Sequence, residues 1–305
     1  MAAAWMILGG IAAADVPQQA LNLLRHGKLR RAHRAVLDGL YESPDDPELQ
    51  AAYGAILTKI GRNAEAVVAF DLATGSSWYE MSGIPFHARA LAQVGRSEEA
   101  VQLRSEFELA GRRKPAASLG VRTGQVEDHV VGGRPGLAVE VALRATEEYP
   151  TSPVAFAALV EAYVAAGELD EAGWALLRGE SFEGAGNTHM RMARMRWHIE
   201  MGDYDAAWDI SEDYRRKRMH DSRLWADRAR IHRLRGQPGD GYRIAMFDRF
   251  SWGLFVELRL EGSLCAEAMG DMEAAKEILA PLVAGYSGHP EVAERMKELG
   301  LVSAP

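Results

Sequence analysis

The chain has 305 residues, a formal net charge of −8 at pH 7 and a single cysteine, Cys265. The acidic balance argues against a protein whose whole surface binds nucleic acid or an anionic membrane. The lone cysteine excludes an intrachain disulfide and any zinc or iron–sulfur site that needs several thiolates.

The first 14 residues form an apolar stretch. Residues 2–14 read AAAWMILGGIAAA, which is typical of the hydrophobic core and small-residue cleavage site of a secretory signal. No Lys or Arg precedes Arg25, so the usual positive start is missing. Two interpretations stay open: a signal of an exported or periplasmic protein, which we favour slightly, and an apolar helix that caps the fold of a cytoplasmic protein. No run of 18 apolar residues exists, so we expect no transmembrane helix.

One short pattern recurs along the rest of the chain: a glycine followed five residues later by a small residue. It occurs at Gly27/Ala32, Gly61/Ala66, Gly95/Ala100, Gly133/Ala138, Gly167/Ala172, Gly202/Ala207, Gly236/Gly241 and Gly270/Ala275. Successive glycines are 34, 34, 38, 34, 35, 34 and 34 residues apart. Such a fixed period indicates a chain built from stacked copies of one unit.

Each repeat contains two helical stretches that meet at the glycine. Glycine ends the first helix easily because it adopts a left-handed backbone conformation. The small residue five positions later lets the second helix cross the first at short distance. A repeat of this size cannot bury both of its helices alone, so neighbouring repeats are expected to stack.

These residues resemble the tetratricopeptide repeat, a helix–turn–helix family with a 34-residue period, over roughly residues 15–300. The second repeat carries the family's characteristic residues at Gly54, Gly61, Ala66, Phe70 and Ala73. The fifth repeat carries them at Phe156, Leu159, Tyr163, Gly167, Ala172 and Leu176. The resemblance implies an all-α, right-handed solenoid of about eight repeats with a C-terminal capping helix. It also implies contacts with other proteins.

Irregular stretches divide the predicted array. The expected segments are repeats 1–3 in residues 15–110, a loop at 111–118, repeats 4 and 5 in 119–178, a loop at 179–188, repeats 6–8 in 189–289, and a capping helix with a tail in 290–305. Gly111 and Pro115 mark the first loop, and Gly179, Gly184 and Gly186 mark the second. A polar helix that follows Pro290 fits a terminal cap.

No catalytic signature is present. The sequence lacks a G-x-S-x-G elbow, an H-E-x-x-H zinc pair and a G-x-x-x-x-G-K-[ST] phosphate loop. We interpret Cys265 as a small core residue rather than a reactive thiol. The prediction is therefore a protein that is not an enzyme, with no catalytic residue, no metal site and no cofactor.

An arginine-rich sequence recurs 34 residues apart, from Arg194 to His198 and from Arg228 to His232. In the family that the chain resembles, certain positions of each first helix line a concave groove. The arginines at these positions, our candidate ligand-binding residues, are Arg89, Arg196, Arg223, Arg230 and Arg233. Several guanidinium groups on one wall would bind carboxylates bidentately and so select an acidic peptide or a chain terminus.

The alternative is that these arginines pair with acids of the chain itself, such as Glu200 and Asp227, or are simply solvated. His198 and His232 are interpreted as packed inside their repeats rather than as metal ligands. A second basic run, which contains no acid, consists of Arg25, Lys28, Arg30, Arg31 and Arg34. It could attract an anionic lipid surface or nucleic acid. A solvated face is the simpler interpretation in an acidic protein, and we expect no nucleic-acid partner.

The sequence thus predicts a scaffold or adaptor that is not an enzyme and that holds a protein or peptide segment in its concave groove. One alternative is a structural subunit of a larger assembly, which would make contacts through its convex face or its ends. Another is an accessory subunit that presents a substrate to a partner enzyme. A monomer and an oligomer are both compatible with the pattern.

Overall fold

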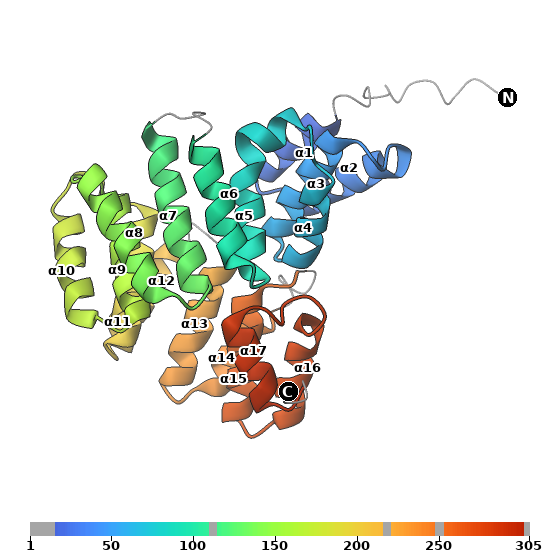
Figure 1. Cartoon of the computed structure of the whole chain (residues 1–305). Helices are drawn as coiled ribbons and strands as arrows, with labels where there is room; N and C mark the ends of the chain where they lie inside the picture. Colours follow the sequence, from blue (N-terminus) through green and yellow to red (C-terminus); the bar gives the residue numbers. More distant parts are fainter. Residues whose placement is uncertain (1–15, 110–114, 216–220, 248–252, 302–305) are drawn as a thin grey trace. The chain divides into compact units, whose positions relative to one another are not determined.

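The computed structural model describes residues 16–109, 115–215, 221–247 and 253–301 (Figure 1). All regular elements in these ranges are helices, and the ranges contain no strand. None of their helices combines the length and apolar character needed to cross a membrane. The apolar residues 1–14 lie outside the described ranges, so both interpretations of that stretch remain predictions.

The helices follow one another in pairs. The first four pairs are α1 (Val16–Arg25) with α2 (Leu29–Glu42), α3 (Pro47–Lys59) with α4 (Asn63–Asp71), α5 (Ile84–Gln93) with α6 (Ser97–Leu109), and α7 (Pro115–Val131) with α8 (Pro135–Glu148). The next four are α9 (Pro153–Ala166) with α10 (Leu169–Glu180), α11 (Thr188–Glu200) with α12 (Tyr204–Arg215), α13 (Ser222–Leu234) with α14 (Pro238–Ala245), and α15 (Val256–Ala268) with α16 (Met272–Leu279). A last helix, α17 (Pro290–Glu298), follows the eighth pair. The all-α solenoid of eight helix pairs and a terminal helix is confirmed.

The turns inside the pairs share one geometry, which the glycines make possible. All eight repeat glycines have positive φ, between 67° at Gly133 and 91° at Gly95. The residue after each glycine donates its backbone N–H to a carbonyl of the preceding helix, as Arg96 does to Leu91 at 2.8 Å. This is the Schellman ending of a helix, which satisfies carbonyl groups that would otherwise lack a partner.

The small residues that follow the turns are buried where the paired helices cross. Those with no exposed surface are Ala32, Ala66, Ala100, Ala138, Ala172, Ala207 and Ala275. The seventh repeat has Gly241 instead, because a Cβ there would lie 2.6 Å from the backbone oxygen of Ala229 and 2.8 Å from Sγ of Cys265. Helices α13 and α14 therefore approach more closely than a side chain at this position would allow.

The chain divides into two compact units, residues 1–87 and 88–305, which we call the N-terminal and C-terminal units. The N-terminal unit contains α1 to α4, a short π-helix (Tyr79–Gly83) and the start of α5. Near the predicted loops, α7 already begins at Pro115 and α10 continues to Glu180. Helical structure thus extends into both stretches that the sequence had marked as irregular.

Candidate functional site

All five candidate arginines lie on first helices of the C-terminal unit. Arg89 is on α5, Arg196 is on α11, and the other three are on α13. We call the faces that carry these arginines and their partner carboxylates the inner wall. The structure pairs all five side chains with carboxylates of first helices, in three groups: Arg89 with Arg223, Arg196 by itself, and Arg230 with Arg233.

Glu127 of α7 connects two of the arginines. Its Oε1 lies 3.6 Å from Arg89 and accepts a hydrogen bond of 3.0 Å from Arg223. Burial alone would raise the pKa of Glu127, but the charges of Arg89 and Arg223 outweigh burial and lower it to about 2. Because α7 and α13 belong to repeats 4 and 7, this carboxylate joins parts of the wall that are far apart in sequence.

Arg196 occupies the middle of the inner wall. It donates from Nη1 to Glu161 of α9 at 3.2 Å and from Nε to Asp227 of α13 at 3.1 Å. Burial alone would lower the pKa of Arg196, whereas the charges of Asp227 and Glu161 raise it above its usual value. The guanidinium therefore stays charged while it crosslinks three neighbouring first helices.

The remaining two arginines share a carboxylate on α15. Arg230 lies 2.7 Å from Glu200 and 4.0 Å from Glu261. Arg233 grips Glu261 with two hydrogen bonds of 2.9 and 3.1 Å. Each of the five candidates is thus paired with carboxylates of the chain itself, and a carboxylate of a partner would have to exchange with them.

The other basic residues of the recurring sequence do not belong to the inner wall. Arg228 is buried, with its guanidinium carbon 4.1 Å from the ring centre of Trp208, and it pairs with Glu212. His198 lies 3.3 Å from Asp203, and His232 packs edge-on against Trp208. In the described part of the chain, no group of three His, Cys, Asp or Glu side chains could hold a metal ion.

A cavity of about 330 Å³ adjoins the inner wall between α13, α15 and α17, and we call it the terminal groove. Its lining residues are Ala226, Asp227, Arg230, Glu257, Leu260, Glu261, Leu264, Glu291, Glu294, Arg295 and Glu298. Its apolar lining consists of Leu260, which is buried, and Leu264, which is half-buried, and carboxylates outnumber guanidinium groups. Arg295 already pairs with Glu267 and Glu298 at 2.8 and 2.9 Å.

Two carboxylates of the terminal groove are not balanced by such pairs. Within the described residues, Glu291 and Glu294 make no ion pair. Burial, followed by the negative charge of Glu257, raises the pKa of Glu291. The groove was not predicted from the sequence, because the charged residues after Pro290 look there like the polar face of a cap. Acids repeat at helical spacing on both α15 and α17, and this pattern was the available signal.

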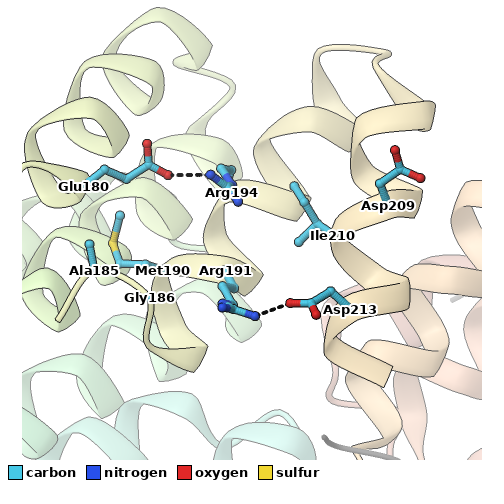
Figure 2. Close-up of a pocket in the computed structure, with 9 residues that line it drawn as sticks. All are labelled: Glu180, Ala185, Gly186, Met190, Arg191, Arg194, Asp209, Ile210 and Asp213. Atoms are coloured by element: carbon cyan, nitrogen blue, oxygen red, sulfur yellow. Dashed lines mark hydrogen bonds and ion pairs between the residues drawn. The ribbon is translucent and has the colours of Figure 1, made fainter. Parts of the chain in front are cut away.

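A second cavity, of about 460 Å³, lies between α10, α11 and α12 (Figure 2). Figure 2 shows Arg194 directed toward Glu180 and Arg191 directed toward Asp213. These pairs span the cavity and neutralise both arginines. The cavity therefore offers a ligand fewer unpaired charges than the terminal groove does.

No protein-family model matches the chain, and no curated protein matches its sequence. Among solved structures, a tetratricopeptide repeat protein from Parabacteroides merdae ATCC 43184 is similar, with a TM-score of 0.52 at 11% identity. The match covers 94% of this chain and 98% of that one. The Cut9–Hcn1 hetero-tetramer of the APC/C gives a TM-score of 0.52 at 12% identity, over 90% of this chain and 52% of the other.

At these identities the likeness concerns the fold. The chain has the fold of a tetratricopeptide-repeat protein, and the resemblance seen in the sequence is confirmed at that level. The present chain spans about half the length of the chain that it matches in the Cut9–Hcn1 assembly.

Proposed function

We propose that this protein is a scaffold without enzymatic activity that binds a segment of a partner protein in the terminal groove. The observation that carries the proposal is the groove itself, which opens beside the inner wall of a tetratricopeptide-type array and is lined by two leucines next to carboxylates that make no ion pair. Apolar contacts would supply affinity, and the charged rim would fix the orientation and register of the segment.

The charges favour a segment that alternates apolar and basic residues. A Lys or Arg of the partner gains Glu291 and Glu294 as new partners without breaking a pair inside the chain. An Asp or Glu of the partner must instead displace Glu200 or Glu261 from Arg230. The acidic segment predicted from the sequence is therefore the second choice, and it would bind along the arginines of the inner wall.

Fluorescence anisotropy distinguishes a basic from an acidic partner segment. It uses two labelled peptides of equal length, one of alternating Leu and Lys and one of alternating Leu and Glu. We expect the basic peptide to bind more tightly, and Glu291→Lys/Glu294→Lys to abolish that preference. Glu147→Lys/Glu183→Lys makes the same charge change at exposed acids outside the groove and should bind like the wild type. Tighter binding of the acidic peptide, lost in Arg196→Glu/Arg230→Glu/Arg233→Glu at unchanged helicity, would favour the arginine site.

Affinity capture from the source cells with the same variants then connects the groove to a natural partner. A protein captured by the wild type and by the control, but lost with Glu291→Lys/Glu294→Lys, supports the proposal. Identical capture by all variants would reject the groove and move the contact to another surface.

One observation favours a second candidate function, a structural subunit that makes contacts through its outer face. Trp174 and Leu177 of α10 are 62% and 71% exposed, and Leu143 of α8 is exposed at the equivalent place one repeat earlier. Apolar side chains gathered on second helices are typical of surfaces that another protein covers. Analytical ultracentrifugation tests this role, because Trp174→Ser/Leu177→Ser should then dissociate an assembly that the wild type forms.

A further inference from the structure

The outward face of α2, in the N-terminal unit, carries an unusual set of exposed side chains. This helix buries only Ala32 and Val36. On its opposite side Arg30, Arg34, Leu37 and Tyr41 follow one another at spacings of four, three and four residues, so they share one face. We call these four residues, together with Arg25, Lys28 and Arg31 at the α1–α2 turn, the basic face.

Four positive charges of the basic face, those of Arg25, Lys28, Arg31 and Arg34, are available to a partner. All five cationic side chains of the basic run are exposed. Within the described residues, Arg25, Lys28, Arg31 and Arg34 form no ion pair with a carboxylate. The two acids of α2, Asp38 and Glu42, lie toward its other end and beside the stripe of Arg30, Arg34, Leu37 and Tyr41.

Two exposed apolar side chains continue the stripe directly after its arginines. Tyr41 is 92% exposed and Leu37 is 43% exposed, although large apolar side chains are usually covered. A hollow of about 340 Å³ on α1 is lined by Leu23, His26 and Lys28 together with polar side chains. The face therefore combines cations, one aromatic ring, one aliphatic side chain and a polar recess beside Lys28.

We propose that the basic face docks the N-terminal unit on an anionic lipid surface. Arginine and lysine near a membrane surface are attracted by acidic headgroups, and the attraction acts only within a Debye length. Leu37 and Tyr41, which follow the cations on the same helix face, can enter the boundary between headgroups and acyl chains, which strengthens and orients the contact. Because the chain as a whole carries a charge of −8, this attraction has to come from a local cluster of cations and not from the net charge.

Two observations favour a lipid surface over nucleic acid. A phosphate backbone would use the arginines equally well, but it offers no apolar environment for Leu37. In addition, the sequence directly before α1 is the apolar stretch of residues 2–14. The inference is independent of the terminal groove, which belongs to the other unit.

The test is co-sedimentation of the full chain with vesicles of phosphatidylcholine alone and with vesicles of equal parts phosphatidylcholine and phosphatidylserine. We expect binding to the anionic vesicles that weakens as salt is raised. Arg31→Glu/Arg34→Glu should lower that binding by roughly a hundredfold or more. Arg144→Glu/Lys297→Glu makes the same change in net charge at exposed cations of the C-terminal unit and should bind like the wild type.

A second variant distinguishes lipid from nucleic acid. Leu37→Ser/Tyr41→Ser keeps every charge, so it should weaken vesicle binding while leaving binding of a double-stranded oligonucleotide unchanged. Circular dichroism checks that both variants keep the helicity of the wild type. Equal binding to neutral and anionic vesicles, or an Arg31→Glu/Arg34→Glu variant that binds like its control, would overturn the proposal. Binding of the oligonucleotide in preference to anionic vesicles would assign the face to nucleic acid instead.

Discussion

At the scale of single residues, the departures from the repeat pattern are as informative as the matches. Gly241 stands where the other repeats have alanine, because the backbone of α13 and the thiol of Cys265 fill the space of a side chain. Gly124 on α7 is explained in a similar way, since a Cβ there would collide with the guanidinium of Arg104. That guanidinium pairs with the fully buried Asp128 at 2.5 Å. At both positions glycine leaves room for a neighbouring group, whereas the repeat glycines form turns.

The first prediction concerns Gly241. Gly241→Ala should lower the free energy of unfolding by about 1–3 kcal/mol, because the added methyl group overpacks the α13–α14 crossing. Gly239→Ala is the matched control in the same helix, since its Cβ would meet only the sulfur of Met269 at 3.7 Å. Urea unfolding followed by circular dichroism measures both. Equal stability of the two variants would show that α13 and α14 separate more easily than their packing indicates.

The second prediction concerns the only thiol. Cys265 is fully buried, and burial together with the charge of Glu261 raises the pKa of its thiol to about 12. The reactive thiolate is therefore scarce at neutral pH. We expect no reaction of the native protein with a thiol-specific reagent such as Ellman's reagent, and complete reaction in denaturant. Rapid labelling of the native protein would contradict the buried position.

At the scale of helices, the features that depend only on residues close together in the sequence could be predicted. The turns at the eight repeat glycines, the buried alanines and the pairing of helices all follow from residues within one repeat. The inner wall could be predicted only in part. Its arginines were identified, but the contact of Arg223 with Glu127 joins repeats 4 and 7 and depends on how the repeats curve. The terminal groove was missed because the acids of α15 and α17 look solvated until the two helices are packed together.

The third prediction tests the ion pairs of the inner wall through pH. The ordinary pKa of a Glu such as Glu127 is 4.5, and in the folded chain it falls to about 2. A lowered carboxyl pKa stabilises the folded state above the ordinary value, and this stabilisation disappears as pH falls through the folded value. Glu127→Gln should therefore be less stable than the wild type at neutral pH, and the difference should shrink between about pH 4.5 and pH 2. Urea titrations across this range measure it, and a difference that does not change with pH would contradict the pairing.

At the scale of the C-terminal unit, the segment before its last helix lies against its first turns. The segment before α17 contacts the turn of repeat 3, where a Cβ on Gly288 would lie 2.8 Å from the backbone oxygen of Val94. Pro290, the first residue of α17, lies near Gly133 in the turn of repeat 4. Because α17 also forms one side of the terminal groove, this contact holds Glu291 and Glu294 in place opposite α13 and α15.

The last prediction connects this contact to binding. Gly288→Val should push the segment before α17 away from Val94, because backbone atoms cannot yield to a side chain as a flexible group can. Hydrogen exchange measured by mass spectrometry should then show faster exchange in α17 and unchanged exchange in α9, since local opening leaves the rest of the array folded. The exposed neighbour Ser287 provides the control Ser287→Ala, which should exchange like the wild type. If the groove binds a partner segment, that ligand should slow exchange in α17 of the wild type and bind Gly288→Val more weakly, because a ligand stabilises the state to which it binds. Faster exchange without weaker binding would mean that the contact holds α17 but that the segment binds elsewhere.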